Sequence, residues 1–327
     1  MRILVTGANG FLGREIVRQA AEAGLSVRAT DRQAACVQPG IEYAPADILE
    51  PESLVPLVRG ISCVVHAAGL TPAAAGRKTE AASFTAVNAT GTANVARAAA
   101  GAGVASFVLI SSVSVYGSSG ALIRNETHPC RPRGAYAESK LQSEERAREI
   151  AGASGMSMRI LRLATLYGEG DAGNVARLLA TIDRGRFMRL GSGSNRKSLL
   201  HREDAARACL AVMRDRGRGI EVFNVSAPPC TMREVVDGLA EALGKRPSRL
   251  AVPSSWLRVA AFLLSKGPLG RERGLAAMTE KWLADDAYDA GAFARRFGFR
   301  TSVGLSEGLR READAYRADK EGRVVSK

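Results

Sequence analysis

Short apolar runs alternate with longer segments of helical periodicity along the first half of the chain. The runs are centred on Ile3, Val27, Val64, Val108 and Ile160. Runs that are apolar at successive positions are typical of parallel strands buried on both faces. Their alternation with helical segments predicts an α/β fold, in which helices cover both faces of a doubly wound parallel sheet.

The pattern changes near residue 168. Beyond it helical spacing dominates, and short strand patterns interrupt it at 198–200 and 222–225. We therefore predict two parts. Residues 1–168 form a domain built on the parallel sheet, and residues 169–327 form mainly a smaller, mixed substrate-binding lobe, with some segments returning to the sheet.

A glycine-rich turn follows the first strand. The segment TGANGFLG places Gly7, Gly10 and Gly13 between that strand and a helix. Glycine lets the backbone approach a ligand closely, and the helix N-terminus offers unpaired N–H groups to a phosphate. This strand, turn and helix predict a Rossmann-type site for a dinucleotide.

The residue at the end of the second strand predicts which dinucleotide binds. Asp31 stands there, close to the expected separation of about 20 residues from the glycine turn. A carboxylate at this point accepts hydrogen bonds from the adenosine ribose hydroxyls and repels a 2′-phosphate. We therefore predict NAD rather than NADP, although the nearby Arg28 and Arg32 would attract that phosphate.

Charge narrows the class of partner. The 327 residues carry a formal net charge of +13, and aromatic residues make up only 5% of the chain. The arginines are spread over many predicted helices, without the interleaving of basic and aromatic residues that single-strand nucleic-acid binders use. We predict no nucleic-acid partner and a small-molecule substrate that is anionic.

The cysteines, histidines and apolar stretches indicate whether the chain binds a metal, forms disulfides or contacts a membrane. The five cysteines have no C-x-x-C spacing and the three histidines are scattered, so we predict reduced thiols and no metal site. No secretory pattern precedes the first strand. The longest apolar stretch, 256–264, contains Arg258 and is too short for a bilayer. We predict that it is an amphipathic helix packed on a cytoplasmic protein, without membrane contact.

A serine, a tyrosine and a lysine are spaced for proton transfer. Ser112 lies at the carboxyl end of a predicted parallel strand, where ligands of open α/β sheets bind. In the segment YAESK, Tyr136 and Lys140 are four residues apart, so a helix projects them from one face. A nearby ammonium favours the phenolate and lowers the tyrosine pKa. We predict that Ser112 holds a substrate oxygen while Tyr136 exchanges its proton.

Five segments resemble, in this order and spacing, the extended short-chain dehydrogenase/reductases of the NAD-dependent epimerase/dehydratase family: TGANGFLG, HAAG, SSVSVYG, YAESK and RLATLYGEGD. The resemblance covers nearly the whole chain, and NRKSLLH is similar to the bacterial polysaccharide branch, which acts on nucleotide-linked hexoses. It implies an enzyme that interconverts an alcohol and a ketone with NAD, and a triad of Ser112, Tyr136 and Lys140. It also implies a homodimer through the Ala-rich helices at 80–100 and 135–150.

The same resemblance implies a cofactor site. The glycine turn would take the diphosphate, Asp47 and Ile48 the adenine, and Lys140 the hydroxyls of the nicotinamide ribose. The implied cofactor-binding residues are Gly7, Asn9, Gly10, Phe11, Leu12, Gly13, Asp31, Arg32, Asp47, Ile48, Ala67, Ala68, Gly69, Asn88, Tyr136 and Lys140.

Three departures from the family pattern limit how closely the substrate can be predicted. Thr165 stands where many nucleotide-sugar members carry asparagine, and RKSLLHRED replaces RDFIHVDD, with Lys197 at the arginine position and His201 and Asp204 retained. A later arginine that often binds a diphosphate has no clear counterpart, although Arg271, Arg273 and Lys281 are near it in sequence. The predicted substrate contacts are Ser112, Ser114, Thr165, Arg196 and Lys197.

Three functional hypotheses follow. The leading one is an NAD-dependent oxidoreductase or 4-epimerase acting on a nucleotide-diphosphate sugar. The alternative is an NAD-dependent dehydrogenase or reductase of a hydrophobic alcohol or ketone, such as a hydroxysteroid or an aryl alcohol. A non-catalytic protein that senses the cofactor is the third, and the intact Ser112, Tyr136 and Lys140 argue against it.

Overall fold

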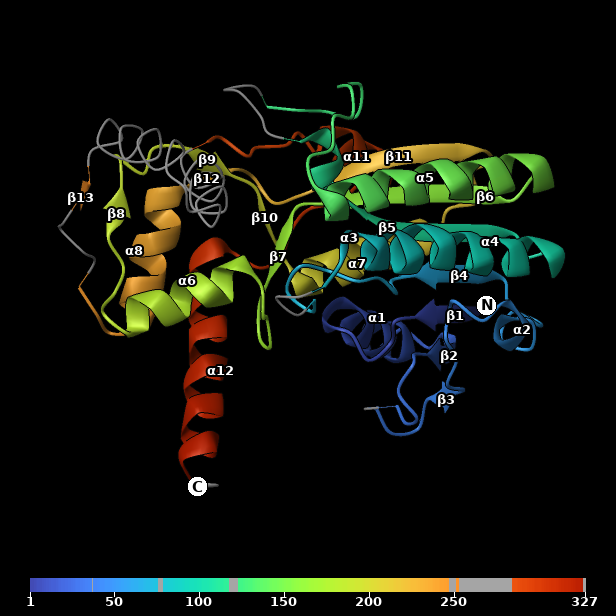
Figure 1. Ribbon diagram of the computed structural model, residues 1–327, viewed down its shortest axis with the longest axis horizontal. Helices are drawn as coiled ribbons and strands as arrows, with labels where there is room; N and C mark the ends of the chain where they lie inside the picture. The colour runs from blue at the N-terminus through green and yellow to red at the C-terminus, as the bar shows by residue number, and fades with distance from the viewer. Residues whose placement is uncertain (37, 76–78, 118–122, 247–250, 253–283, 326–327) are drawn as a thin grey trace.

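The computed structural model describes residues 1–36, 38–75, 79–117, 123–246, 251–252 and 284–325. Its centre is a seven-stranded sheet in which every pairing is parallel (Figure 1). The strand order, β11-β6-β5-β4-β1-β2-β3, confirms the predicted doubly wound α/β fold. The strands are β1 (Arg2–Thr6), β2 (Ser26–Thr30), β3 (Glu42–Tyr43), β4 (Cys63–His66), β5 (Ser106–Ser112), β6 (Ser157–Leu163) and β11 (Ile220–Val225).

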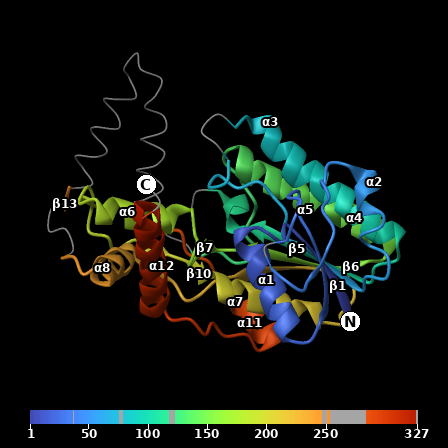
Figure 2. The ribbon, with the colours of Figure 1, turned by 90° about the horizontal axis from the view of Figure 1, so that it is seen from below.

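Helices cover both faces of this sheet (Figure 2). Alternation along β1 shows how, because Ile3 and Val5 enter one buried cluster and Leu4 enters the other. The helices on the first face are α1 (Phe11–Glu22), α7 (Arg202–Met213) and α11 (Gly291–Phe297). Those on the second face are α2 (Pro51–Leu54), α3 (Ala81–Phe84), α4 (Gly91–Gly101) and α5 (Ala135–Ser154).

The predicted helix at 80–100 is not a single α-helix. A π-helical segment, η1 (Thr85–Thr90), separates α3 from α4. Asn88 lies in this wider turn, where its Oδ1 accepts from the Leu70 amide at 2.7 Å and its Nδ2 donates to the Leu70 carbonyl at 3.0 Å. These two bonds fix the loop after β4 to the helix. Single π turns are frequent at functional sites.

A second lobe has its own core. It packs α6 (Asn174–Asp183), α8 (Met232–Ala242) and α12 (Leu305–Val325) around Leu179, Leu239 and Leu309, which are fully buried. The short strand pairs are β7 (Thr165–Tyr167) with β10 (Leu199–His201), β8 (Arg189–Leu190) with β13 (Ala251–Val252), and β9 (Arg196–Lys197) with β12 (Cys230–Thr231).

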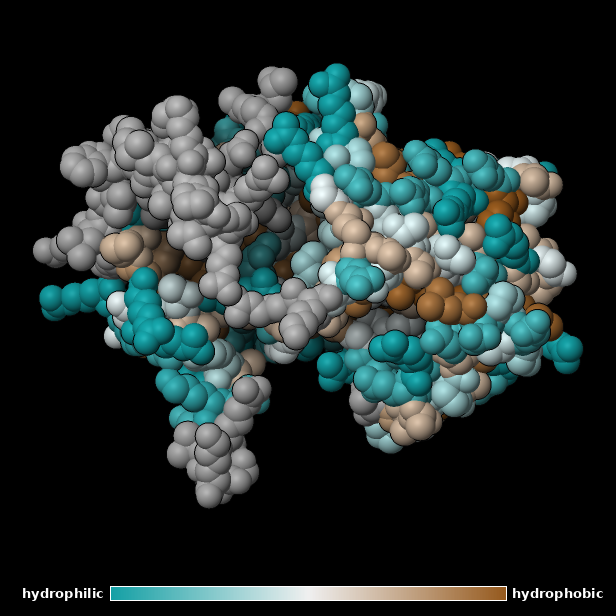
Figure 3. Space-filling model, in the orientation of Figure 1, coloured by the Kyte–Doolittle hydropathy of each residue, from teal (hydrophilic) through white to brown (hydrophobic). Residues whose placement is uncertain are grey.

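The surface is mainly hydrophilic on the face seen in Figure 3, with apolar residues gathered over α4 and α5. None of the helices that the structure describes is long and apolar enough to cross a membrane. The apolar stretch 256–264, predicted as an amphipathic helix, lies outside the described residues.

Candidate active site

The glycine turn is closed so tightly that side chains are excluded from it. Gly7 has φ of +68°, and a Cβ on it would lie 2.6 Å from the Ala68 backbone. A Cβ on Gly13 would lie 1.9 Å from the Gly7 carbonyl oxygen. The hydrogen bond from the Arg14 amide to the Gly10 carbonyl, 3.1 Å, is in the first turn of α1. The amides of the three residues before Arg14 therefore have no helical carbonyl to bind and fit a diphosphate.

Asp31 lies directly beside this turn. Its carboxylate accepts from the Asn9 amide at 3.0 Å and from the Arg32 amide at 2.7 Å. The nearby Arg28 is committed elsewhere, because its Nε donates to Glu42 at 2.8 Å and its Nη1 to the Leu57 carbonyl at 2.7 Å. The carboxylate is thus fixed at the end of β2, and this arrangement fits an adenosine ribose without a 2′-phosphate.

The remaining predicted cofactor residues surround the same edge of the sheet. Ile48 is buried and packs on Gly91, where a Cβ would lie 2.5 Å from its Cδ1. Asp47 accepts from the Leu49 amide at 2.9 Å. A Cβ on Gly69 would lie 3.1 Å from Asn88 Oδ1 and 3.8 Å from Lys140 Nζ. The loop after β4 therefore joins the glycine turn to the predicted catalytic lysine.

A buried histidine joins three elements behind this loop. His66 Nδ1 is 2.8 Å from the Thr6 hydroxyl, and its Nε2 is 2.9 Å from the Thr92 hydroxyl. Burial, reinforced by the charge of Lys140, lowers the pKa of His66 to about 3. The Thr6 hydroxyl also accepts from the Ala68 amide at 3.3 Å. A neutral imidazole therefore helps to hold the backbone next to the glycine turn.

Tyr136 contacts Ser112, and Lys140 lies one turn further along the same helix. Tyr136 and Lys140 lie in the first turns of α5, and Ser112 is the last residue of β5. Burial raises the pKa of Tyr136, while a hydrogen bond with Ser112 acts in the opposite direction. Lys140 is buried, its Nζ donates to the Ile110 carbonyl at 2.6 Å, and burial lowers its pKa to about 8 although Glu144 raises it. At neutral pH this lysine is mainly an ammonium group.

An ion pair beneath Lys140 was not predicted from the sequence. Glu144, one turn further along α5, binds Arg162 of β6 through contacts of 2.7 and 3.0 Å, and both are buried. Ser111 donates to the same carboxylate at 2.6 Å. Arg162 also donates to the Tyr116 hydroxyl at 3.0 Å. The signal was a pair of arginines, Arg159 and Arg162, in a mainly apolar strand, and a carboxylate four residues after the lysine.

The predicted substrate residues are not all at this site. Ser114 lies in the 3-10 helix η2 (Val113–Tyr116) and donates its amide to the Ser112 hydroxyl oxygen at 3.2 Å. Thr165 lies in β7, whereas Arg196 and Lys197 form β9 in the second lobe (Figure 1). Lys197 Nζ donates to the Ala284 carbonyl at 2.9 Å. The candidates Arg271, Arg273 and Lys281 lie outside the described residues.

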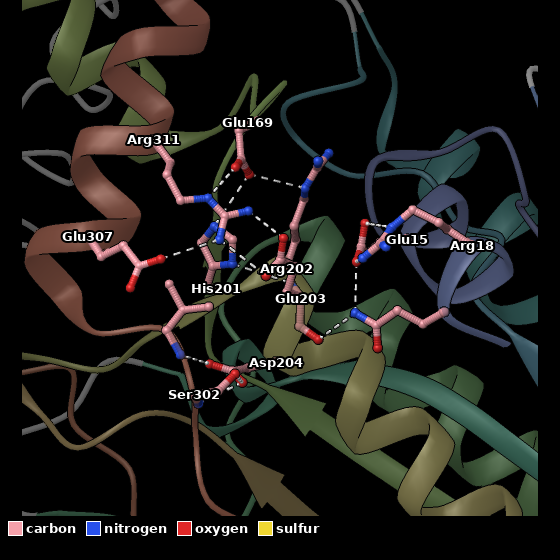
Figure 4. A network of polar contacts seen from close by, with 12 residues as sticks. Glu15, Arg18, Glu169, His201, Arg202, Glu203, Asp204, Ser302, Glu307 and Arg311 are labelled. Carbon is pink, nitrogen blue, oxygen red and sulfur yellow. Dashed lines mark hydrogen bonds and ion pairs between the residues drawn. The ribbon is translucent and has the colours of Figure 1, made fainter. Parts of the chain in front are cut away.

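A polar network joins the two halves of the molecule next to the glycine turn (Figure 4). Arg311 of α12 binds Glu169, in the loop after β7, and Glu203 of α7. His201 caps α7, and burial lowers its pKa. Asp204 accepts from Ser302 and Val303. Sequence reasoning noted His201 and Asp204 as family positions and missed the partners. Within the described residues, no cluster of three or more His, Cys, Asp or Glu could hold a metal.

Comparisons with known proteins identify the family. The model of the NAD dependent epimerase/dehydratase family matches residues 3–226. The chain is 29% identical to N-acetyl-alpha-D-glucosaminyl-diphospho-ditrans,octacis-undecaprenol 4-epimerase of Escherichia coli O157:H7, over 94% of this chain and 93% of that protein. It is 30% identical to ceramide reductase of Caulobacter vibrioides, over 97% of this chain and 94% of that protein. The solved structure of MoeE5 in complex with UDP-glucose and NAD has a TM-score of 0.78 and 27% identity, covering 98% of this chain and 100% of that chain.

These findings confirm the predicted enzyme class and its cofactor, NAD. The family model spans the glycine turn, Asp31 and the segment that contains Ser112, Tyr136 and Lys140. The seven-stranded parallel sheet and the similar solved structure agree with it. The chain belongs to the NAD dependent epimerase/dehydratase family.

Proposed function

We propose that the chain is an NAD-dependent oxidoreductase or 4-epimerase acting on a nucleotide-diphosphate sugar, and that Ser112, Tyr136 and Lys140 carry its proton transfer. One observation supports the proposal most. A buried ammonium, a tyrosine that contacts Ser112, and a serine at the carboxyl end of β5 lie together beside the loop that reaches the glycine turn. These are the groups that an alcohol–ketone interconversion requires.

The proposed roles follow from the contacts. When bound, NAD supplies a nicotinamide that accepts and returns a hydride. The Ser112 oxygen accepts from the Ser114 amide, and its hydroxyl, which contacts Tyr136, would turn to donate to the substrate oxygen in the complex. Tyr136 then accepts a proton from the substrate alcohol or returns it to the ketone. Burial alone would keep the phenol protonated, so the Lys140 ammonium has to offset that burial.

The cofactor residues are proposed on the same basis. The glycine turn and the α1 amides would hold the diphosphate, Asp31 and Arg32 the adenosine ribose, and Lys140 the second ribose. Residues proposed to complete the site are Gly7, Asn9, Gly10, Phe11, Leu12, Gly13, Asp47, Ile48, Ala67, Ala68, Gly69, Asn88 and Tyr136.

A diphosphate-linked sugar is supported by two of the similar proteins. The relative from Escherichia coli is named for a sugar carried on a lipid diphosphate, and MoeE5 was solved with UDP-glucose. We propose that Ser112, Ser114 and Thr165 contact the sugar and that Arg196 and Lys197 of the second lobe, 169–327, contact the anionic group. We further propose a cytoplasmic homodimer in polysaccharide biosynthesis, paired through α4 and α5; Leu141 and Ile150 of α5 are half-buried.

A hydrophobic alcohol or ketone is the second candidate, and contacts at β9 favour it. Asp285 accepts from the Arg196 amide at 2.6 Å, and the backbones of Asp286 and Lys197 form a β-bridge next to it. The Asp285 carboxylate at this place would repel a diphosphate. The similarity to a ceramide reductase points the same way.

Turnover assays with a tyrosine variant test the proposal. We expect the wild type to convert UDP-glucose, UDP-glucuronic acid or a lipid-linked N-acetylglucosaminyl diphosphate. Tyr136→Phe removes the proton-transfer oxygen and should lower turnover by about 10²–10⁴-fold, with unchanged NAD affinity. Tyr316→Phe, which removes a hydroxyl bound to Asp183 in the second lobe, is the matched control. Near-full turnover by Tyr136→Phe would contradict the triad. Turnover of ceramide-type ketones alone would support the second candidate.

A further inference from the structure

Arg202 is placed beside the glycine turn by two elements. It is the first residue of α7, and its guanidinium carbon lies 5.7 Å from the ring centre of Phe11, the first residue of α1. The backbone of Gly168 packs on its stem, since a Cβ there would lie 3.3 Å from Arg202 Cγ. The guanidinium group is therefore held next to the helix end whose amides have no helical partner.

The buried Nε of this guanidinium group has no hydrogen-bond acceptor among the described residues. The Arg202 side chain is only 24% exposed. Figure 4 shows the Arg202 side chain pointing away from Glu203, with its ion pair to Glu169. A guanidinium N–H that is buried without a hydrogen-bond acceptor costs free energy.

The carboxylates nearest to Arg202 are also bound by other groups. Glu169 Oε2 lies 3.5 Å from Arg202 Nε, but Glu169 is bound by Arg311 through its other oxygen. Glu203 is also bound by Arg311. Glu15 of α1 is bound by Arg18 and accepts from Gln19 at 2.7 Å. Arg202 thus shares Glu169 with Arg311, and its own contact with that carboxylate is a longer ion pair without a hydrogen bond.

Arg202 departs from the sequence pattern of the family. In RKSLLHRED, Arg202 stands where the family pattern RDFIHVDD has valine. An aliphatic residue would fill the space over Phe11 without adding charge. The arginine adds donors of the geometry that binds phosphate oxygens in pairs.

We propose that the Arg202 guanidinium contacts the diphosphate of the bound dinucleotide and supplements the amides at the start of α1. A diphosphate is also present in a nucleotide-sugar substrate. Because Arg202 lies over Phe11, at the end of α1 that is predicted to bind an anion, we infer that the diphosphate it contacts is that of the cofactor. The inference rests on the NAD dependence of the family and not on the identity of the substrate.

Calorimetric titrations of the full chain test this contact. Arg202→Gln should weaken NAD binding about tenfold and leave UDP binding unchanged. The salt dependence of NAD affinity should also become shallower in the variant. Arg202→Lys should recover part of the affinity. Arg214→Gln removes an exposed charge at the far end of the same helix and should leave NAD affinity unchanged.

A second variant separates the loss of the guanidinium charge from a loss of packing. Arg202→Met keeps the aliphatic stem on Phe11, and it should show the same loss of NAD affinity with unchanged thermal unfolding in the absence of NAD. Unchanged NAD affinity in both variants overturns the inference, as does weakened UDP binding with unchanged NAD affinity. A wild type that binds no NAD would instead contradict the proposed function itself.

Discussion

The catalytic edge of the sheet and the junction with the second lobe treat buried charge differently. At the catalytic edge, Lys140 is buried with a backbone carbonyl as its hydrogen-bond acceptor, and His66 is kept neutral between two hydroxyls. At the junction, Glu169 and Glu203 share Arg311, and Asp204 binds Arg207 at 2.6 Å as well as two backbone amides. Glu169, Glu203 and Asp204 at the junction are thus paired with arginines, whereas Lys140 at the catalytic edge has a backbone carbonyl as its hydrogen-bond acceptor.

This difference separates function from stability. A buried ammonium that lacks a close counterion costs free energy, and such groups persist where chemistry needs them. Paired and hydrogen-bonded carboxylates at the junction instead fix how α7, α12 and the loop after β7 pack. Breaking such a pair is costly because the remaining partner stays buried.

The largest effect is expected at Lys140. Lys140→Met should lower turnover by about 10³-fold, because the phenolate loses its electrostatic support. The same change should raise the free energy of unfolding at pH 7 by roughly 1–2 kcal/mol. Urea unfolding and turnover assays measure the two effects.

The pH dependence gives this prediction its control. Burial lowers the pKa of Lys140 to about 8, so the native state binds fewer protons than the unfolded state above that pH. Wild-type stability should therefore rise from pH 8 toward the ordinary lysine pKa, and the advantage of Lys140→Met should shrink over that range. A methionine variant less stable than wild type at pH 7 would show that the lysine is compensated after all.

A smaller loss is expected at the junction. Asp204 is buried and accepts from the Ser302 amide at 2.9 Å and the Val303 amide at 3.1 Å. Asp204→Ala leaves those donors and Arg207 without their acceptor, and should lower the free energy of unfolding by about 3 kcal/mol. Asp314→Ala breaks only exposed pairs on α12, and thermal unfolding should show a change of less than about 0.5 kcal/mol. Equal effects of the two changes would remove the distinction between the junction and the surface.

The smallest effect concerns a carboxyl group that the junction does not pair. Glu312 of α12 is buried, its Oε2 accepts from the Gly168 amide at 3.2 Å, and its Oε1 has no hydrogen-bond partner within the described residues. Burial, followed by the charge of Asp171, raises its pKa to about 8. The native state therefore binds an extra proton between the ordinary glutamate pKa and pH 8, and wild-type stability falls as pH rises through that range.

Glu312→Gln should remove this dependence. At pH 8.5 the variant should be more stable than wild type by about 1–2 kcal/mol, and at pH 5 the two should be nearly equal. Urea unfolding at both values measures the difference. A gap of the same size at pH 5 would mean that ionisation of Glu312 is not its cause.

Local patterns in the sequence were sufficient to predict the fold class and the family. The apolar runs predicted β1, β2, β4, β5 and β6, and the pattern at 222–225 predicted β11, whereas β3 was not predicted. The segment TGANGFLG predicted a turn, and a Cβ on Gly7 or Gly13 would clash with the backbone there. The spacing of Tyr136 and Lys140 placed both on one face of α5. Each of these features depends on residues a few positions apart, so local periodicity and steric limits are enough to reveal it.

Contacts between distant segments were decided only by the tertiary structure. Glu144 meets Arg162 because β5 and β6 pair in register beneath α5, and Asn88 binds Leu70 because a π turn interrupts the predicted helix. Arg202 reaches Phe11 across 191 positions of sequence (202 minus 11) because α7 packs on α1. Periodicity reports which face of an element is buried and carries no information about its partner. The sequence therefore determined the elements and the reactive groups, whereas packing determined which charges are compensated and which remain for binding and catalysis.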